Sequence, residues 1–500
     1  MSQLRKTSSL PPLPPLLERT DWRWMAGVAV VYLLYLPFSG YSQQYFDAQN
    51  YWELPSRFIT PERHFSLLHY SSLTRGYAWP LVLTPWRAAW KLLGGSPMLY
   101  IQVLGSLVAA LCYGWLGPRL WQVLHGAGQL PGPVARLAFV LTGFVFWRDY
   151  FNFALTDFPA LILLLAALLL VARGLLQGSM PSRPAVGWWL LAGSLLGLAC
   201  NFRGIYTLSL YPVLLATAWP TVPGAAGVRG SGLRVAALLL GGALVLAPQY
   251  LMTRQHAPPG SAWHLSGVLN QNDLVKRHLG QGISNFRYEA NIGTDYPEAR
   301  VWLRDPIGQA LARRHSISPA GIAPVAYLKL ALRYPLEFGA LLTQRLFSGL
   351  DLQQPSPFLR QLYRATWLLA GTNYTLLGLG LLVLGRQLWR ARRLPGRRLL
   401  LATSLLLPAL GALPMALESR FLLPLHIGLC MAATLGFPAD WHPARLRHTL
   451  RPLQRMVLLA LYVGWLALNF AFSSYTHIHL EYGGRLLGGS GPEPVTEQRP

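Results

Sequence analysis

About eleven stretches of roughly 15 to 24 mostly apolar residues divide this chain, and each is long enough to cross a bilayer. Counted from a cytoplasmic N-terminus, one alternate set of the gaps between them holds most of the arginine clusters, such as the run from Arg386 to Arg398. The other set holds 16 of the 19 Asp and Glu residues. Because Lys and Arg are retained on the cytoplasmic side, the acidic gaps are expected to face outward. Any chemistry that needs a carboxylate is therefore predicted at the outer face of the membrane.

The composition agrees with a membrane protein. Hydrophobic residues make up 52% and charged residues 12% of the chain, whereas a soluble chain carries about 25% charged residues. The formal net charge of +24 comes from basic residues in short loops beside apolar segments. This placement indicates topology determinants and contact with anionic lipid headgroups, not nucleic-acid binding. Cys112, Cys200 and Cys430 all lie in apolar segments without a C-x-x-C spacing, which predicts buried free thiols.

The predicted fold is an all-α polytopic membrane protein with about 11 transmembrane helices, within a range of roughly 10 to 13. Residues 1–21 are expected to form a disordered cytoplasmic tail, residues 22–474 the transmembrane domain and residues 475–500 an extracytoplasmic tail. The predicted spans cover about residues 22–38, 97–116, 134–147, 158–172, 187–200, 204–219, 234–251, 365–385, 399–417, 421–437 and 456–473.

Two long segments separate spans on the outer side, at about residues 39–96 and 252–362. In the first, Trp79–Leu93 is apolar but carries two basic residues, so it is expected to lie in the membrane interface. In the second, Tyr327–Phe347 places apolar and basic residues on separate helical faces and is interrupted at Pro335. This pattern favours two extracytoplasmic interfacial helices, and a small folded periplasmic cap is the alternative.

Polar residues gather at the outer ends of the spans, while ionisable residues deep inside the spans are almost absent. Pumps and ion-coupled transporters usually need such buried charges, so their rarity counts against transport. No P-loop or nucleotide-binding glycine fingerprint is present to bind ATP or a nucleotide sugar. Carboxylates and guanidiniums above apolar grooves suit a substrate with a charged head and an apolar tail. The residues at this rim are Asp47, Glu53, Arg75, Asp149, Asp157, Arg203, Glu418 and Arg420.

Short motifs at the rim carry a resemblance to a known family. They are YFDAQNYW at residues 45–52, Arg75-Gly76-Tyr77, TDFP at residues 156–159 and ESRFLLP at residues 418–424. Their order resembles that of GT-C membrane glycosyltransferases, in particular the bacterial dolichyl-phosphate-mannose protein mannosyltransferase-like group, also described as family 39-like. The chain departs from the commonest pattern of that family because Asp47 stands alone, without an adjacent acidic partner. This departure leaves dependence on a divalent cation open.

The resemblance implies a GT-C-like fold and the inverting transfer of a sugar from a polyprenyl-phosphate-linked donor. The reaction is expected at the extracytoplasmic face of a bacterial inner membrane, in the biosynthesis of cell-envelope polysaccharide, with a lipid, glycan or protein as the acceptor. A carboxylate can accept the proton of the acceptor hydroxyl, and a guanidinium matches a phosphate with a planar fork. The roles implied are general base for Asp47, donor phosphate binding for Arg203, Arg75 and Arg420, and support by Asp157, Asp149, Glu418 and Glu53.

Each of these residues also has a purely structural interpretation: a helix cap or solvated loop carboxylate, an interfacial ion pair, or an arginine that reaches to the interface from a helix end. At the level of the whole protein, two alternatives stay open. One is a lipid-linked oligosaccharide flippase or polymerase-type protein, which needs a cationic central cavity, and the other is a non-catalytic envelope-assembly protein. His477 and His479 supply two ligands without a third, so no metal site is predicted there.

Overall fold

The computed structural model of the chain describes residues 16–72, 75–125, 131–176, 184–220, 225–256, 271–296, 298–318, 320–361, 366–390, 396–436, 452–482 and 485–486. Most of both predicted tails, residues 1–15 at the start and 487–500 at the end, lies outside these ranges. Cys112, Cys200 and Cys430 are buried free thiols, as predicted.

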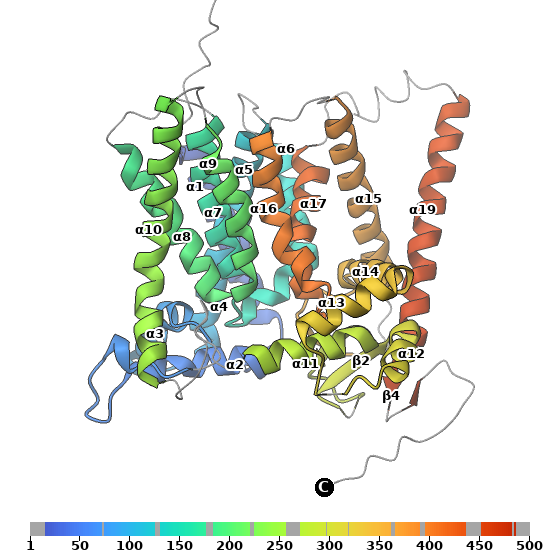
Figure 1. Ribbon diagram of the computed structural model, residues 1–500, viewed down its shortest axis with the longest axis horizontal. Helices are drawn as coiled ribbons and strands as arrows, with labels where there is room; N and C mark the ends of the chain where they lie inside the picture. The colour runs from blue at the N-terminus through green and yellow to red at the C-terminus, as the bar shows by residue number, and fades with distance from the viewer. Residues whose placement is uncertain are drawn as a thin grey trace, which may run out of the picture.

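Helices lie side by side as a bundle across the described chain (Figure 1). Every segment predicted to span the membrane contains one. These helices are α1 (Arg19–Tyr35), α4 (Pro97–Ala109) continued by a π-helical stretch (Ala110–Leu116) and α5 (Gly117–His125), α6 (Pro133–Trp147), α7 (Asp157–Leu176), α8 (Pro184–Phe202), a 3-10 stretch (Gly204–Ser209) with α9 (Leu210–Ala218), α10 (Ala225–His256), α15 (Trp367–Arg390), α16 (Gly396–Ala412), α17 (Leu423–Leu435) and α19 (Pro452–Ile478).

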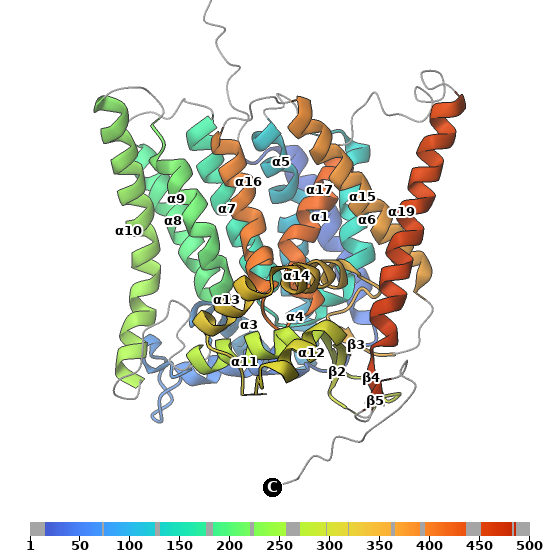
Figure 2. The same ribbon diagram turned by 45° about the vertical axis from the view of Figure 1, so that its right-hand side comes forward.

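Length and composition single out a subset of these helices. Among the described residues, five helical stretches are long and apolar enough to cross a membrane, and three further apolar stretches are shorter. The chain is therefore a mostly helical protein with membrane-spanning helices, and the count of about 11 spans stays a prediction. The apolar window of α7 is 72% buried inside the protein, whereas that of α19 is 11% buried. Helix α7 is thus central, and α19 stands at the edge of the bundle (Figure 2).

Both predicted outer segments lie at the same end of the bundle, called the loop end below (Figures 1 and 2). The first contains α2 (Phe46–Glu53) and α3 (Ala78–Leu93), and the second contains α11 (Gln271–Ser284), α12 (Pro306–Arg314), α13 (Pro324–Arg333) and α14 (Pro335–Leu350). Helices α13 and α14 meet at Pro335, where the sequence predicted an interruption, because proline is accommodated in the first turn of a helix but not in its interior.

A small sheet at the loop end corrects the all-α expectation. Its central strand β1 (Asn285–Asn291) pairs antiparallel with β2 (Arg300–Arg304) and parallel with β3 (Phe358–Leu359). A separate two-stranded ladder joins β4 (Glu481–Tyr482) to β5 (Arg485–Leu486). Residues 285–291 alternate polar and apolar side chains, which is the period-2 signal of a strand. The signal covers only seven residues, which is too short to predict a strand between two helical segments.

The predicted topology can be tested by labelling with an impermeant thiol reagent. Glu298 is exposed in the segment between β1 and β2, and Leu394 belongs to the basic segment between α15 and α16 and lies outside the described residues. Glu298→Cys is expected to label in intact cells and Leu394→Cys only after the membrane is opened. The three native thiols are buried and give a low background. The reverse pattern would invert the topology.

Candidate functional site

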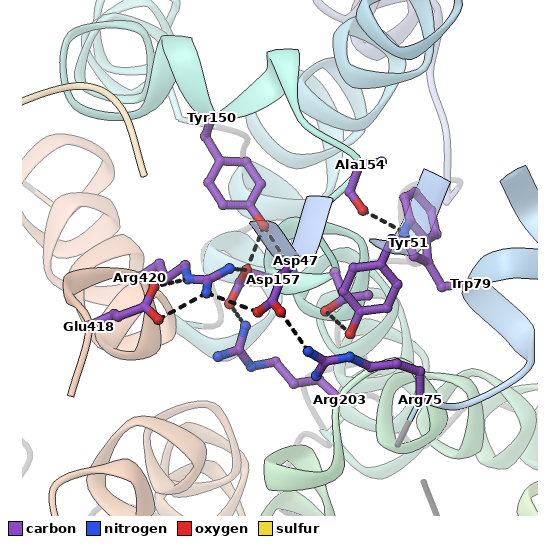
Figure 3. Close-up of polar contacts among 11 residues, drawn as sticks. Asp47, Tyr51, Arg75, Trp79, Tyr150, Ala154, Asp157, Arg203, Glu418 and Arg420 are labelled. Atoms are coloured by element: carbon purple, nitrogen blue, oxygen red, sulfur yellow. Dashed lines mark hydrogen bonds and ion pairs between the residues drawn. The ribbon is translucent and has the colours of Figure 1, made fainter. Parts of the chain in front are cut away.

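Asp47 lies in the first turn of α2 at the loop end, and its carboxylate lies between two guanidiniums. Arg75 Nη2 donates to Asp47 Oδ1 at 2.7 Å, and Arg420 Nη2 lies 3.4 Å from Asp47 Oδ2 (Figure 3). The side chain of Asp47 is 36% exposed. The preceding residue, Phe46, has a positive φ of 46°, a conformation that costs free energy and is often found at functional sites. Its ring packs near that of Phe358, at 5.8 Å between centroids.

Arg75 is positioned by the close packing of the next residue against the end of α8. A Cβ atom on Gly76 would lie 2.1 Å from the backbone oxygen of Asn201, so only glycine fits at position 76. Asn201 Oδ1 also accepts a hydrogen bond from the backbone N–H of Ala78 at 2.9 Å. The guanidinium of Arg75 lies over the ring of Tyr51, 5.1 Å from its centroid. These contacts bring the end of the first outer segment next to the turn after α8.

Asp157 is the first residue of α7 and is almost fully buried, with 2% of its side chain exposed. Its carboxylate forms an ion pair with Arg203, accepts a hydrogen bond from the hydroxyl of Tyr150 at 2.6 Å, and lies 3.6 Å from Arg420 Nη1. The start of a helix carries partial positive charge, which adds to the stabilisation of a carboxylate there. Arg203 comes from the turn between α8 and the 3-10 stretch at Gly204–Ser209.

Arg420 connects the two aspartates to a third carboxylate. It lies in a 3-10 turn (Ser419–Leu422) that precedes α17, and it pairs with Glu418 as well as with Asp47 and Asp157 (Figure 3). The ring of Phe421 lies beneath both Arg203 and Arg420, at 4.6 and 5.6 Å from their guanidinium carbons. The aspartate–arginine cluster, defined as Asp47, Arg75, Asp157, Arg203, Glu418 and Arg420, thus joins four segments that are far apart in the sequence.

The cluster balances three carboxylates against three guanidiniums. Burial raises the pKa of Asp47, but the charges of Arg75 and Arg420 lower it by more, so its pKa lies below the usual value for an aspartate. Asp47 is therefore ionised at neutral pH. Each carboxylate is already shared with a guanidinium, which competes with any divalent cation. Among the described residues, no group of three or more His, Cys, Asp and Glu side chains is arranged to hold a metal ion.

Two residues predicted to support the site lie outside the cluster. Asp149 accepts a hydrogen bond from the hydroxyl of Tyr35 at 2.6 Å and lies 4.0 Å from Arg148 Nε. Tyr35 belongs to α1, and Arg148 belongs to the same 3-10 turn as Asp149. Glu53, at the end of α2, accepts a hydrogen bond from Gln49 at 3.0 Å on the exposed side of that helix. These hydrogen bonds join Asp149 and Glu53 to Tyr35 and Gln49, which are not members of the cluster.

A cavity of about 1330 Å³ borders the cluster at Glu418 and Arg420. It extends from there between β1, the segment after α14 and the end of α19. A second cavity, between Trp79, Leu104 and Phe158, is apolar and measures about 10 Å³, roughly the space of one water molecule. That cavity is too small for an isoprenoid chain, so it does not supply the apolar groove expected below the rim.

Several residues that shape the site were not predicted. Tyr150 bonds to Asp157, Phe421 supports two arginines, and Glu289 of β1 accepts a hydrogen bond from Ser419 next to Arg420 at 3.0 Å. Tyr150 and Phe421 are adjacent in sequence to Asp149 and Arg420, but single aromatic residues beside apolar spans are common and carry little signal. Nothing in the sequence connects Glu289 to position 419, because only the folded sheet brings them together.

Comparisons with known proteins give a similarity in structure but none in sequence. No family model matches the chain, and no curated protein matches its sequence. The crystal structure of ArnT from Cupriavidus metallidurans bound to undecaprenyl phosphate is similar over 87% of this chain and 82% of its own, with a TM-score of 0.36 and 16% sequence identity. A similarity at this level assigns neither a family nor a function to the chain.

Proposed function

We propose that this protein is a membrane glycosyltransferase of the GT-C type, which transfers a sugar from a polyprenyl-phosphate donor to an acceptor at the extracytoplasmic face. The observation that carries the proposal is the aspartate–arginine cluster at the loop end of the membrane helices. Two guanidiniums, those of Arg75 and Arg420, pair with an ionised, partly exposed Asp47. A third, that of Arg203, pairs with the neighbouring Asp157. A phosphate group needs such cations, and an acceptor hydroxyl needs such a carboxylate. The motif resemblance to GT-C enzymes points to the same chemistry.

In the proposed reaction, the acceptor oxygen attacks the anomeric carbon of the donor sugar. The bond between that carbon and the phosphate oxygen breaks, and polyprenyl phosphate leaves with the electron pair. Asp47 accepts the proton of the acceptor hydroxyl, and attack from the side opposite the phosphate inverts the anomeric configuration. Arg75 and Arg203 are the guanidiniums best placed to turn toward the phosphate, because 34% and 20% of their side chains are exposed, against 8% for Arg420.

Donor binding and base strength are linked in this mechanism. With no donor bound, Arg75 and Arg420 lower the pKa of Asp47 and so weaken it as a base. A donor phosphate competes for the same guanidiniums and draws them from the carboxylate. The pKa of Asp47 then rises, because burial still raises it whereas the guanidiniums that lower it now also interact with the phosphate. Asp47 is therefore expected to become a stronger base only when the donor is in place.

The proposal is tested by binding of undecaprenyl phosphate to the purified protein in detergent. Arg203→Ala is expected to weaken binding roughly ten- to hundredfold, the range for loss of a hydrogen bond to a charged group. Arg203→Lys is expected to be intermediate, because lysine supplies the charge without the planar fork. Arg313→Ala, an exposed residue of α12, is the control and should bind like the wild type. Equal affinity of all four proteins would remove Arg203 from the phosphate site.

The pH dependence of transfer gives an independent test of Asp47. Since kcat/KM reports the free enzyme, the donor-free pKa of Asp47 sets the acidic limit. That pKa is below the usual value near 3.9, so kcat/KM should stay level from about pH 7 to about pH 5. Arg75→Ala removes the largest influence that lowers this pKa. Protonation then begins at a higher pH, and activity should fall at a higher pH than in the wild type. An unshifted acidic limit in this variant would contradict the assignment of the base.

A further inference from the structure

The cavity of about 1330 Å³ at the loop end is large enough to hold a substrate of several rings, since small-molecule sites typically measure roughly 300–1,000 Å³. Glu418, Ser419 and Arg420 form part of its wall. Arg420 also lies 3.4 Å from Asp47, so its guanidinium separates the cavity from the proposed base. A molecule held in the cavity therefore lies one side chain away from Asp47.

The cavity wall presents fixed polar groups of both charge signs. Arg287 Nε lies 3.2 Å from Glu289 Oε1 on β1, and Ser419 Oγ donates to the same carboxylate oxygen at 3.0 Å. Asp351 accepts hydrogen bonds from Tyr374 at 2.6 Å, Ser473 at 2.8 Å and Gln353 at 3.0 Å. Aliphatic side chains, among them Ile292, Leu303 and Leu480, lie between these groups. The wall therefore offers hydrogen-bond donors, hydrogen-bond acceptors and apolar patches within one cavity.

The polar and apolar groups of the cavity wall distinguish among a lipid, a protein and a glycan as the acceptor. The tail of a lipid would cover charged groups of the wall and leave them without water, which costs free energy. A peptide commonly binds by adding a strand to an exposed sheet edge, but β1 is paired on both sides, β2 is bridged to Leu480, and the other edge strand, β3, has only two residues. A carbohydrate carries hydroxyl groups that donate and accept hydrogen bonds, together with C–H faces that pack against aliphatic side chains. Of the three classes, it matches the wall best.

We infer that this cavity is the acceptor subsite and that the acceptor is a glycan or another polyhydroxylated compound, with Glu289 as a binding residue. This inference rests on the proposed glycosyltransferase function and names the substrate class of its second site. Glu289 lies beside the cluster, because its carboxylate bonds to Ser419, the residue between Glu418 and Arg420. The acceptor hydroxyl would enter past Arg420 and give its proton to Asp47 as the glycosidic bond forms.

The test compares cell-envelope fractions by mass spectrometry in cells of the source organism with and without the gene. Glycan, lipid and protein fractions are examined separately for one missing sugar. Loss of a sugar from the glycan fraction supports the inference. Loss from the lipid or the protein fraction overturns the inference and leaves the glycosyltransferase function standing. If no fraction loses a sugar, the proposed function itself fails, and the inference fails with it.

Variants of the restored gene then connect the glycan product to the cavity. Glu289→Gln keeps the size of the side chain and removes its charge, and Thr294→Trp, at an exposed lining residue, fills part of the cavity. Glu289→Gln is expected to restore roughly tenfold less glycan product than the wild type at equal protein level, in line with the loss of a charged hydrogen bond. Thr294→Trp is also expected to restore less, because its side chain occupies space that the acceptor needs. Both should still bind undecaprenyl phosphate like the wild type. Full glycan restoration by both variants would exclude the cavity as the acceptor subsite.

The matched control is Glu298→Gln, which makes the same chemical change beside the same sheet. Glu298 is exposed and is not part of the cavity wall, so this variant should restore the glycan fully. Glu289 is buried, so a loss of product in Glu289→Gln has misfolding as a second explanation. Thr294→Trp removes this ambiguity, because an exposed position tolerates a larger side chain. A loss of undecaprenyl phosphate binding in Thr294→Trp would overturn the separation of acceptor and donor sites.

Discussion

Asp47→Asn is expected to lower transfer about 10²- to 10⁴-fold, the usual contribution of a positioned general base. Asparagine has nearly the same shape as aspartate but cannot accept the proton of the acceptor hydroxyl. The side chain is 36% exposed, so the amide can be solvated and the protein should stay folded. The measurement is the turnover of a polyprenyl-phosphate sugar by purified protein, together with its thermal unfolding. Undecaprenyl phosphate binding should persist, since the three guanidiniums are unchanged.

The control for this change is Glu62→Gln in the same outer segment. Glu62 is exposed, belongs to neither of the two cluster motifs of that segment, and has no role in the proposed mechanism. It should transfer at the wild-type rate. Wild-type turnover by Asp47→Asn would show that another group accepts the proton, and the base would then have to be sought among Asp157 and Glu418.

Arg420→Met is expected to damage both the fold and the reaction. Arg420 is the cation shared by Asp47, Asp157 and Glu418, and only 8% of its side chain is exposed. Methionine fills a similar volume but leaves those carboxylates without their common partner. Breaking a buried ion pair by removing one partner typically costs about 3–5 kcal/mol. We expect a lower unfolding temperature in detergent and loss of undecaprenyl phosphate binding and of transfer.

Two further variants serve as comparisons for Arg420→Met: the conservative replacement Arg420→Lys and the control Arg313→Met. Lysine restores the charge but contacts fewer carboxylates at once, so it should recover much of the stability and less of the transfer. Arg313 is exposed on α12, and its replacement should alter neither property. An Arg420→Met protein with wild-type stability would show that the three carboxylates do not depend on Arg420.

The helical part of the fold could be predicted because apolar segments of membrane length dominate the sequence. The alternation of charge sign between segments placed Asp47, Arg75, Arg203 and Arg420 at one end of the bundle, and the structure brings them into contact there. Their chemical roles stay predictions. A loop of two to four residues leaves little freedom, so the position of Arg203 followed directly from its place between two helices.

Side-chain partners could not be predicted in the same way. Asp149 lies in the 3-10 turn Arg148–Asn152 and Asp157 begins α7 eight residues later, yet Asp149 bonds to Tyr35 and Asp157 joins the cluster. Sequence spacing does not fix the direction of either side chain. Nor did the sequence indicate that Gly76 is required by the approach of Asn201.

The sheet and the large cavity were missed for a related reason. Strand β1 finds its partners at residues 300–304 and 358–359, and such pairings are not encoded in a local pattern. The cavity wall combines β1, the segment after α14 and the end of α19. The alternation of charge sign between segments predicts that they lie on the same side of the membrane. Only tertiary packing decides that they enclose a space beside Arg420.

A structure of the protein with undecaprenyl phosphate bound would test the proposed donor site most directly. The phosphate is expected within hydrogen-bond distance of Arg75 or Arg203, next to Asp47, with the prenyl chain leading away along the lipid-facing surface of the helices. The pairing of Arg75 with Asp47, now 2.7 Å, should be lengthened or replaced. A phosphate bound elsewhere, with all ion pairs of the cluster intact, would contradict the proposed function.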